Sequence, residues 1–162
     1  MERCEECGFD YAGVAAGEVS ERLRGFGSRF GAALAGVADP RRRPAPAVWS
    51  PLEYTCHVRD VFVVQGERLA LGLREDRPEF VPMGREERVV ADAYNDQEPS
   101  LVLAALSVAA SALAASFAVL SAAELARTGR YPWPEPAERT LLWLGRHTVH
   151  EGEHHLLDVT RF

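Results

Sequence analysis

The sequence contains no lysine, and all 18 of its basic residues are arginine. Since 24 acidic residues outnumber them, the formal net charge is −6, and the chain lacks the positive surplus of a general nucleic-acid-binding protein. Cysteine is scarce too, and an odd set of three does not form the disulfide framework of a small secreted protein. The first residues, Met1 to Glu6, are polar and acidic, unlike a secretory signal peptide. We therefore expect a cytoplasmic protein whose partner is a small molecule and not a nucleic acid.

Only one charge-free run, residues 101–120, is long enough to cross a bilayer. The run is rich in Ala and Ser and stands alone, which favours a buried helix of a bundle, so no membrane partner is expected. The chain is 47% hydrophobic, and its 162 residues fit one domain. We divide that domain into a leader, residues 1–16, and a helical body, residues 17–162.

Apolar residues recur at helical spacing in four long stretches, which predict helices over about residues 17–37, 51–73, 100–124 and 136–162. The second stretch has the clearest beginning. Ser50 is its predicted N-cap, Pro51 takes the first helical position, and Glu53 completes a capping box. Because no convincing strand pattern and no repeat is present, we predict an all-α four-helix bundle. A long connection, residues 74–99, joins its second and third helices.

This connection is longer than most in a compact domain, which indicates a functional or mobile segment. We predict that Arg85 takes part in catalysis and that Arg88, Tyr94 and Asn95 bind substrate or cofactor. Either arginine is suited to hold a carboxylate. The alternative is a solvated flap.

Four of the five histidines lie between residues 147 and 155. On a helix, His147, His150 and His154 share one stripe, whereas His155 points elsewhere. His57 faces inward from the second predicted helix. We therefore predict that His57, His150 and His154 bind a metal ion and leave one coordination position open. Nitrogen ligands suit Zn²⁺ best here, with Ni²⁺ or Fe²⁺ as alternatives. The simpler alternative is a set of half-buried histidines bonded to the backbone.

His150-Glu151-x-x-His154 also matches the zincin pattern, in which the glutamate is a general base. A peptidase is disfavoured, because position 160 holds Thr160 and only eight residues follow His154, too few for a distant third ligand. Glu151 nevertheless stays a candidate catalytic base.

The leader contains Cys4-x-x-Cys7, which can supply half of a zinc site or a redox pair. No second motif of this kind follows and no strand precedes it. Cys56 completes a three-cysteine set only if the leader folds back. The alternative is a leader held on the bundle by Phe9 and Tyr11.

Two segments together resemble the DinB family of bacterial four-helix bundles. They are Trp49-Ser-Pro-Leu-Glu-Tyr-Thr-Cys-His57-Val-Arg-Asp60 and His150-x-x-x-His154-His155-Leu-Leu-Asp158, and the resemblance spans about residues 49–160. It implies a three-histidine metal site on His57, His150 and His154. The family includes metal-dependent thiol S-transferases and the mycothiol-dependent maleylpyruvate isomerase.

The resemblance thus implies an enzyme in which a divalent ion activates a low-molecular-weight thiol such as mycothiol for attack on a small electrophile. A metal-water hydrolase and a non-catalytic metal- or ligand-binding bundle are the alternatives. A homodimer is left open.

Overall fold

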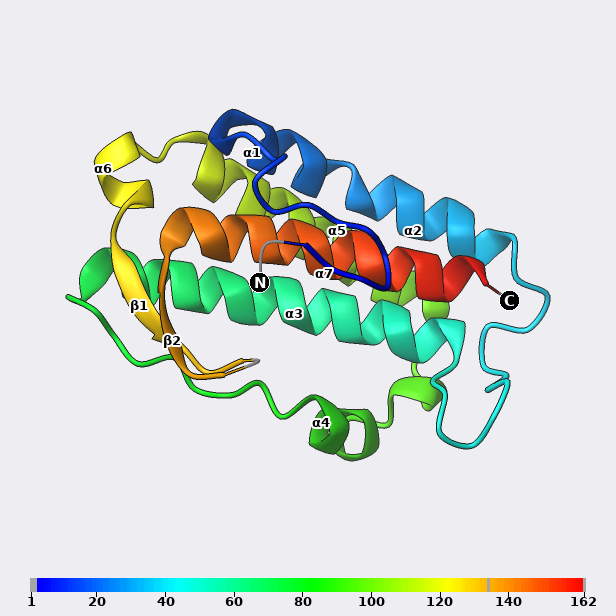
Figure 1. Ribbon diagram of the computed structural model, residues 1–162. Helices are drawn as coiled ribbons and strands as arrows, with labels where there is room; N and C mark the ends of the chain where they lie inside the picture. Colours follow the sequence, from blue (N-terminus) through cyan, green and yellow to red (C-terminus); the bar gives the residue numbers. More distant parts are fainter. Residues whose placement is uncertain (1–2, 134, 162) are drawn as a thin grey trace.

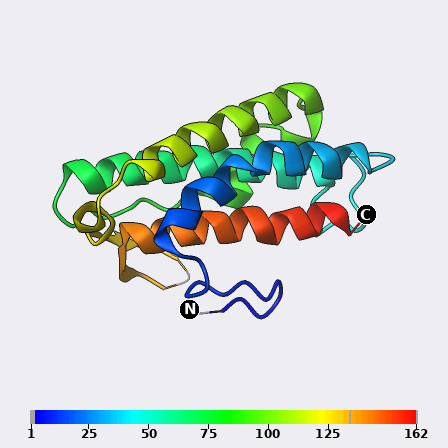
Figure 2. The same cartoon turned by 90° about the horizontal axis from the view of Figure 1, so that it is seen from above.

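The computed structural model describes residues 3–133 and 135–161, and most of them belong to helices that run side by side (Figure 1). In chain order the elements are α1 Ala16–Arg24, α2 Phe26–Ala35, α3 Pro51–Arg74, α4 Arg85–Ala91, the 3₁₀ helix η1 Tyr94–Asp96, α5 Pro99–Ala118, α6 Ala122–Leu125, β1 Thr128–Tyr131, β2 Ala137–Thr140 and α7 Leu141–Thr160. The bundle consists of α1 followed by α2, then α3, α5 and α7 (Figure 2). This confirms the predicted four-helix bundle and its long connection, which includes α4 and η1.

The first predicted helix, residues 17–37, is interrupted at Gly25, where α1 ends and α2 begins. Glycine weakens a helix by about 1 kcal/mol relative to alanine, but it also allows close packing. A Cβ atom at Gly27 would lie 2.5 Å from the Ser107 hydroxyl oxygen on α5, and one at Gly152 of α7 would lie 2.4 Å from the Phe26 ring. The missing side chains therefore let α2 approach both neighbouring helices.

The beginning of α3 has the predicted capping box. The Ser50 hydroxyl accepts a hydrogen bond from the Glu53 backbone N–H at 3.1 Å, and the Glu53 carboxylate accepts one from the Ser50 N–H at 2.8 Å. Arg43 pairs with the same carboxylate, which is buried. This ion pair ties the proline-rich segment before α3 to the first turn of the helix.

The expectation that the chain has no strand was wrong in one place. β1 and β2 form an antiparallel hairpin in which Thr128 lies opposite Thr140 and Tyr131 lies opposite Ala137. The last helix consequently begins at Leu141 and not near residue 136, because residues 137–140 pair with β1. Thr140 then caps α7, accepting a hydrogen bond from the Trp143 N–H at 3.0 Å.

Among the described residues, α5 is the one helix long and apolar enough to cross a membrane by length and composition. Its buried side chains, Leu106, Ala110 and Leu113 among them, face α1, α2 and α3. The opposite face exposes Leu101 and Val108. The position of α5 agrees with the predicted role as a core helix of the bundle.

The leader crosses the outer side of α7, as Figures 1 and 2 both show. Phe9, Tyr11 and Val14 are buried there and belong to the main apolar core. The leader is therefore held on the bundle by Phe9 and Tyr11, as one of the two sequence interpretations expected. Its cysteines come to lie over α7 as a result.

Candidate metal centre

A cavity of about 770 Å³ lies between α3 and α7, beneath the leader and the beginning of α4. Residues at helical spacing on α3 face it, beginning with His57 two turns after the helix cap and continuing to Arg68. The last helix contributes the side chains that carry most of its titratable groups, namely His147, His150, Glu151, His154 and His155. All five histidines of the chain thus line one cavity.

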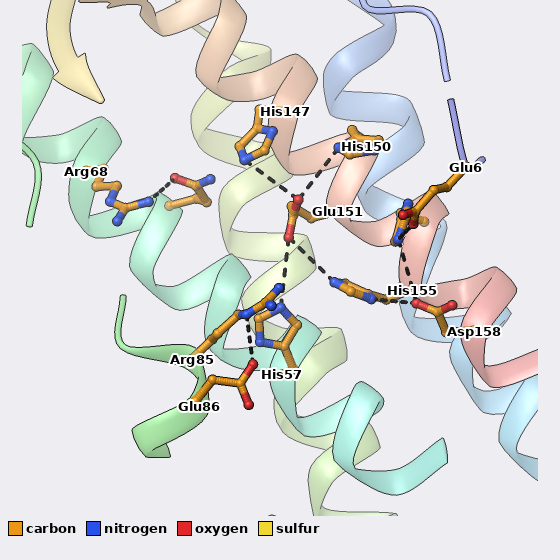
Figure 3. Close-up of polar contacts among 12 residues, drawn as sticks. Glu6, His57, Arg68, Arg85, Glu86, His147, His150, Glu151, His155 and Asp158 are labelled. Atoms are coloured by element: carbon orange, nitrogen blue, oxygen red, sulfur yellow. Dashed lines mark hydrogen bonds and ion pairs between the residues drawn. The ribbon is translucent and has the colours of Figure 1, made fainter. Parts of the chain in front are cut away.

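Glu151 lies at the centre of this wall (Figure 3). One carboxylate oxygen is 3.9 Å from His57 Nε2 and 3.7 Å from His155 Nε2. The other oxygen is 3.7 Å from His147 Nε2 and 3.6 Å from His150 Nδ1. Burial by itself would raise the pKa of Glu151, but the neighbouring His155 and His57 hold that pKa well below its usual value. The carboxylate is therefore an anion among imidazoles.

His155 is oriented by a second carboxylate. Its Nδ1 lies 2.9 Å from Asp158 Oδ2, one turn further along α7, and its Nε2 faces Glu151. Burial opposes the charged ring, but Asp158 and Glu151 raise the pKa of His155 to about 9. An Nδ1–H donated to Asp158 leaves Nε2 as the atom available to a cation. Carboxylates orient metal-binding histidines in this way.

The other buried imidazoles of the cavity are neutral. Burial lowers the pKa of both His57 and His147, and it lowers the pKa of His150 to about 4. Neutral imidazole is the form that binds metal ions, so no proton has to leave these rings near neutral pH.

Potential ligand atoms form four overlapping groups in the described part of the chain, and within each group all of them lie within 4.8 Å of one another. Two of the groups share no residue. The first, which we name the cavity triad, consists of His57, Glu151 and His155. The second, which we name the leader cluster, consists of Cys4, Cys7, His150 and His154.

The expected set of His57, His150 and His154 is not one of these groups among residues 3–133 and 135–161. The reason lies in the rotation of the helix by roughly 100° per residue. Glu151 and His155 form a stripe that faces α3, whereas His150 and His154 form the next stripe, which faces the leader. His155, expected to point elsewhere, points at His57, with ring centroids 4.8 Å apart.

The residues expected to bind substrate or cofactor from the long connection are dispersed. Arg85 lies at the edge of the cavity, where it pairs with Glu86 at 3.1 Å. The other three are not among the lining residues. Arg88 donates to the Met83 carbonyl, and Asn95 joins Ser50 to Arg41. Tyr94 is fully buried and donates to Asp60. Their contacts hold the connection against α3.

A polar group that the sequence analysis did not single out lies further along the cavity. Arg68 is buried, and its guanidinium donates to the Tyr131 hydroxyl at 2.7 Å and to the Val81 carbonyl at 2.6 Å. Gln65 donates to the same hydroxyl at 2.7 Å. Arg68 and Gln65 lie three residues apart and share a face of α3, but Tyr131 comes from the unexpected hairpin. Sequence spacing alone therefore did not reveal the group.

Comparisons with known proteins agree with the fold. A family model described as the DinB superfamily matches residues 23–159. The solved structure of YfiT from Bacillus subtilis, described as a probable metal-dependent hydrolase with an unusual four-helix bundle topology, is similar with a TM-score of 0.78. The two sequences are 18% identical, and the match covers 90% of this chain and 86% of YfiT. No curated protein matches the chain.

Proposed function

The chain belongs to the DinB superfamily, and we propose that it is an enzyme whose divalent metal ion is held by the cavity triad and activates a nucleophile. The observation that carries the proposal is the convergence of His57, Glu151 and His155 on the wall of a large cavity. Two neutral or readily deprotonated imidazoles and one carboxylate are a donor set that suits Zn²⁺ and also Fe²⁺. The predicted metal type is thus kept, while the ligand set differs from the three histidines.

The residues present fit such an ion. Asp158 fixes the orientation of His155, so that Nε2 and not Nδ1 faces the cavity. His57 is buried and neutral, and its Nε2 faces the same carboxylate oxygen of Glu151 as His155 does. Glu151 was a candidate general base in the sequence. Its place between two imidazoles makes it a ligand in this proposal.

Three protein ligands leave coordination positions open, which is the arrangement of catalytic and not of structural sites. When bound, a divalent ion would lower the pKa of a coordinated thiol or water molecule and so supply a nucleophile at neutral pH. The chain's own residues hold the reacting groups in place. Val61 and Val64 line the cavity near His57 and reduce the access of bulk water to this part of it.

Arg68 indicates what kind of substrate enters. An arginine stays charged in a protein, and a buried charge needs an anionic partner to offset its desolvation. Its partners in the structure are a hydroxyl group, an amide and a carbonyl, and its Nε atom is buried without a hydrogen-bond partner among the described residues. We assign the anionic group of the substrate, a carboxylate for example, to this end of the cavity.

The nucleophile we favour is a low-molecular-weight thiol of the mycothiol type, so that the protein is a thiol S-transferase. This choice is supported by the resemblance to DinB-family S-transferases and by the cavity, which is large enough for a thiol and an electrophile together. Water is the alternative nucleophile, supported by the description of YfiT as a probable metal-dependent hydrolase.

The test compares two glutamates on the same helix. Metal-loaded protein is given mycothiol and monochlorobimane, and conjugate formation is followed by fluorescence in the wild type, Glu151→Gln and Glu153→Gln. Glu153 is a matched control, because it pairs with Arg29 on the exposed side of α7. We expect turnover in the wild type and in Glu153→Gln only.

A second assay replaces the thiol with an activated ester and water. Metal-dependent ester cleavage that Glu151→Gln abolishes, with no conjugate formed in the first assay, would make the protein a hydrolase. Equal rates for Glu151→Gln and the wild type in both assays would overturn the proposal.

A further inference from the structure

A second group of potential ligands lies outside the proposed catalytic centre. It joins the Cys-x-x-Cys of the leader to two histidines one turn apart on α7, and none of its four residues belongs to the cavity triad. We propose that Cys4, Cys7, His150 and His154 bind one Zn²⁺ as a closed structural site that fastens the leader to α7.

The leader folds into a tight loop around its cysteines. The Gly8 N–H donates to the Cys4 carbonyl at 2.9 Å, and the Cys4 N–H donates to the Phe9 carbonyl at 2.8 Å. Gly8 has a φ angle of +74°, in the left-handed region that favours glycine. The chain therefore reverses directly after the second cysteine, and both thiols reach the same two histidines.

His150 has one ring nitrogen free for a ligand. Its Nδ1 lies 3.0 Å from the Tyr11 hydroxyl, so the leader itself determines how this ring is oriented. Its Nε2 is buried and has no hydrogen-bond partner among the described residues. A buried polar atom without a partner destabilises a fold unless something binds it, and a metal ion would do so here.

His154 is oriented in the complementary way. Its Nδ1 lies 3.7 Å from Cys4 Sγ, while its Nε2 lies 3.3 Å from a Glu6 carboxylate oxygen and 3.9 Å from an Asp158 oxygen. A carboxylate behind a ligating histidine is the usual outer partner in zinc sites. In tetrahedral zinc sites neighbouring ligand atoms are about 3.3 to 3.8 Å apart, which includes the distance between Cys4 Sγ and His154 Nδ1.

The donor set distinguishes this site from the cavity triad. Two thiolates and two imidazoles fill a tetrahedral shell and leave no position for substrate, as in structural zinc sites. Cys4 and His150 are buried, and Phe9 packs on the His150 ring with centroids 5.3 Å apart. Because Arg3 to Glu6 line the cavity, the ion would also hold the edge of the substrate pocket in place.

The experiment uses Co²⁺ as a spectroscopic probe in reduced, metal-free protein. Bound thiolates give Co²⁺ an intense sulfur-to-metal charge-transfer band in the near ultraviolet, and the cavity triad contains no sulfur. We expect this band in the wild type, in Glu151→Gln and in Cys56→Ser, but not in a Cys4→Ser/Cys7→Ser double variant. Cys56 is a matched control, since it is buried on α3 outside the cluster.

Two adjacent histidines then test the imidazole ligands and the fold separately. His154→Gln should weaken Zn²⁺ binding at this site at least 100-fold in competition with a chelator, whereas His155→Gln should leave it unchanged. Helix content measured by circular dichroism should stay the same in both variants, because the bundle core does not include the leader cysteines' thiols. Zn²⁺ should also protect two of the three thiols from alkylation.

Absence of the charge-transfer band in the reduced wild type would overturn the inference, and so would its survival in the double variant. Recovery of Cys4 and Cys7 as a disulfide, without bound metal, from cells lysed under thiol-trapping conditions would also overturn it in favour of a redox pair. Loss of turnover in Glu151→Gln does not bear on this site, so the two proposals fail independently.

Discussion

Two neighbouring stripes of α7 offer a metal ion very different surroundings. Glu151 and His155 face α3 and, together with His57, present three ligands to a cavity of about 770 Å³. His150 and His154, each one residue earlier, face the leader and meet two cysteines. Since ligand number separates catalytic from structural sites, a step of one residue along one helix changes the chemistry that a site can support.

The strongest test of this contrast substitutes adjacent histidines. His155→Ala should lower kcat/KM on the order of 1,000-fold, because it removes a ligand of the proposed catalytic ion. His154→Ala should change kcat/KM much less, because it affects the leader. Steady-state kinetics on metal-loaded protein measures both. Similar losses in the two variants would remove the functional distinction between the stripes.

The carboxylate behind the cavity triad should have the next largest effect. Asp158→Asn keeps the shape of the side chain but weakens the bond that orients His155. We expect metal affinity at the triad to fall about 10- to 100-fold, as for other outer partners of metal ligands. Competition with a chelator measures the change. An unaltered affinity would show that His155 needs no orienting group.

Arg68 lies away from both stripes and should affect substrate and not metal. Arg68→Met should raise KM about 10-fold with little change in kcat, since a hydrogen bond to a charged group contributes about 1.5 kcal/mol. Arg88→Met is the control, because Arg88 does not line the cavity. A neutral analogue of the substrate should be insensitive to Arg68→Met.

Tyr11 makes a smaller contribution, and only on the leader side. Its hydroxyl contacts His150 at 3.0 Å and His147 at 2.8 Å. Tyr11→Phe should weaken Zn²⁺ binding at the leader cluster about fivefold, corresponding to roughly 1 kcal/mol for a lost hydrogen bond. The ring still packs on Trp143. Isothermal titration of each site separates this effect from any change at the cavity triad.

The smallest effect on either site is expected from the cap of α3. Ser50→Ala should lower the free energy of unfolding by about 1 kcal/mol, a usual value for a lost N-cap. Urea denaturation measures it. Neither metal affinity should change, because His57 lies two turns into the helix. A change would mean that the beginning of α3 determines the position of His57.

Much of the fold followed from local patterns. The capping box at Ser50 marked the beginning of α3, and the apolar periodicity of residues 101–120 marked α5. The hairpin was missed because each strand has four residues and an irregular burial pattern, too short for period-two alternation to be evident. The interruption at Gly25 depended on packing against α5, which no local pattern contains.

The site was predictable in composition but not in grouping. The residue types and the helix of each ligand were apparent from the sequence, and so was the inward direction of His57. Which histidines share an ion depends on how α7 is rotated against α3 and on where the leader lies. Both are tertiary facts, set by contacts such as Phe9 on His150 and Tyr11 on Trp143.

That rotation is itself fixed from behind. Gly152 lies roughly 200° around α7 from His150 and from His154, and the Phe26 ring occupies the space that any Cβ atom would need. Turning the helix on its axis by even a fraction of a residue would drive backbone atoms into that ring. The aromatic side chain of α2 thus sets the aim of every ligand on the far side, and inherited variation at position 152 should be confined to glycine wherever both stripes are retained.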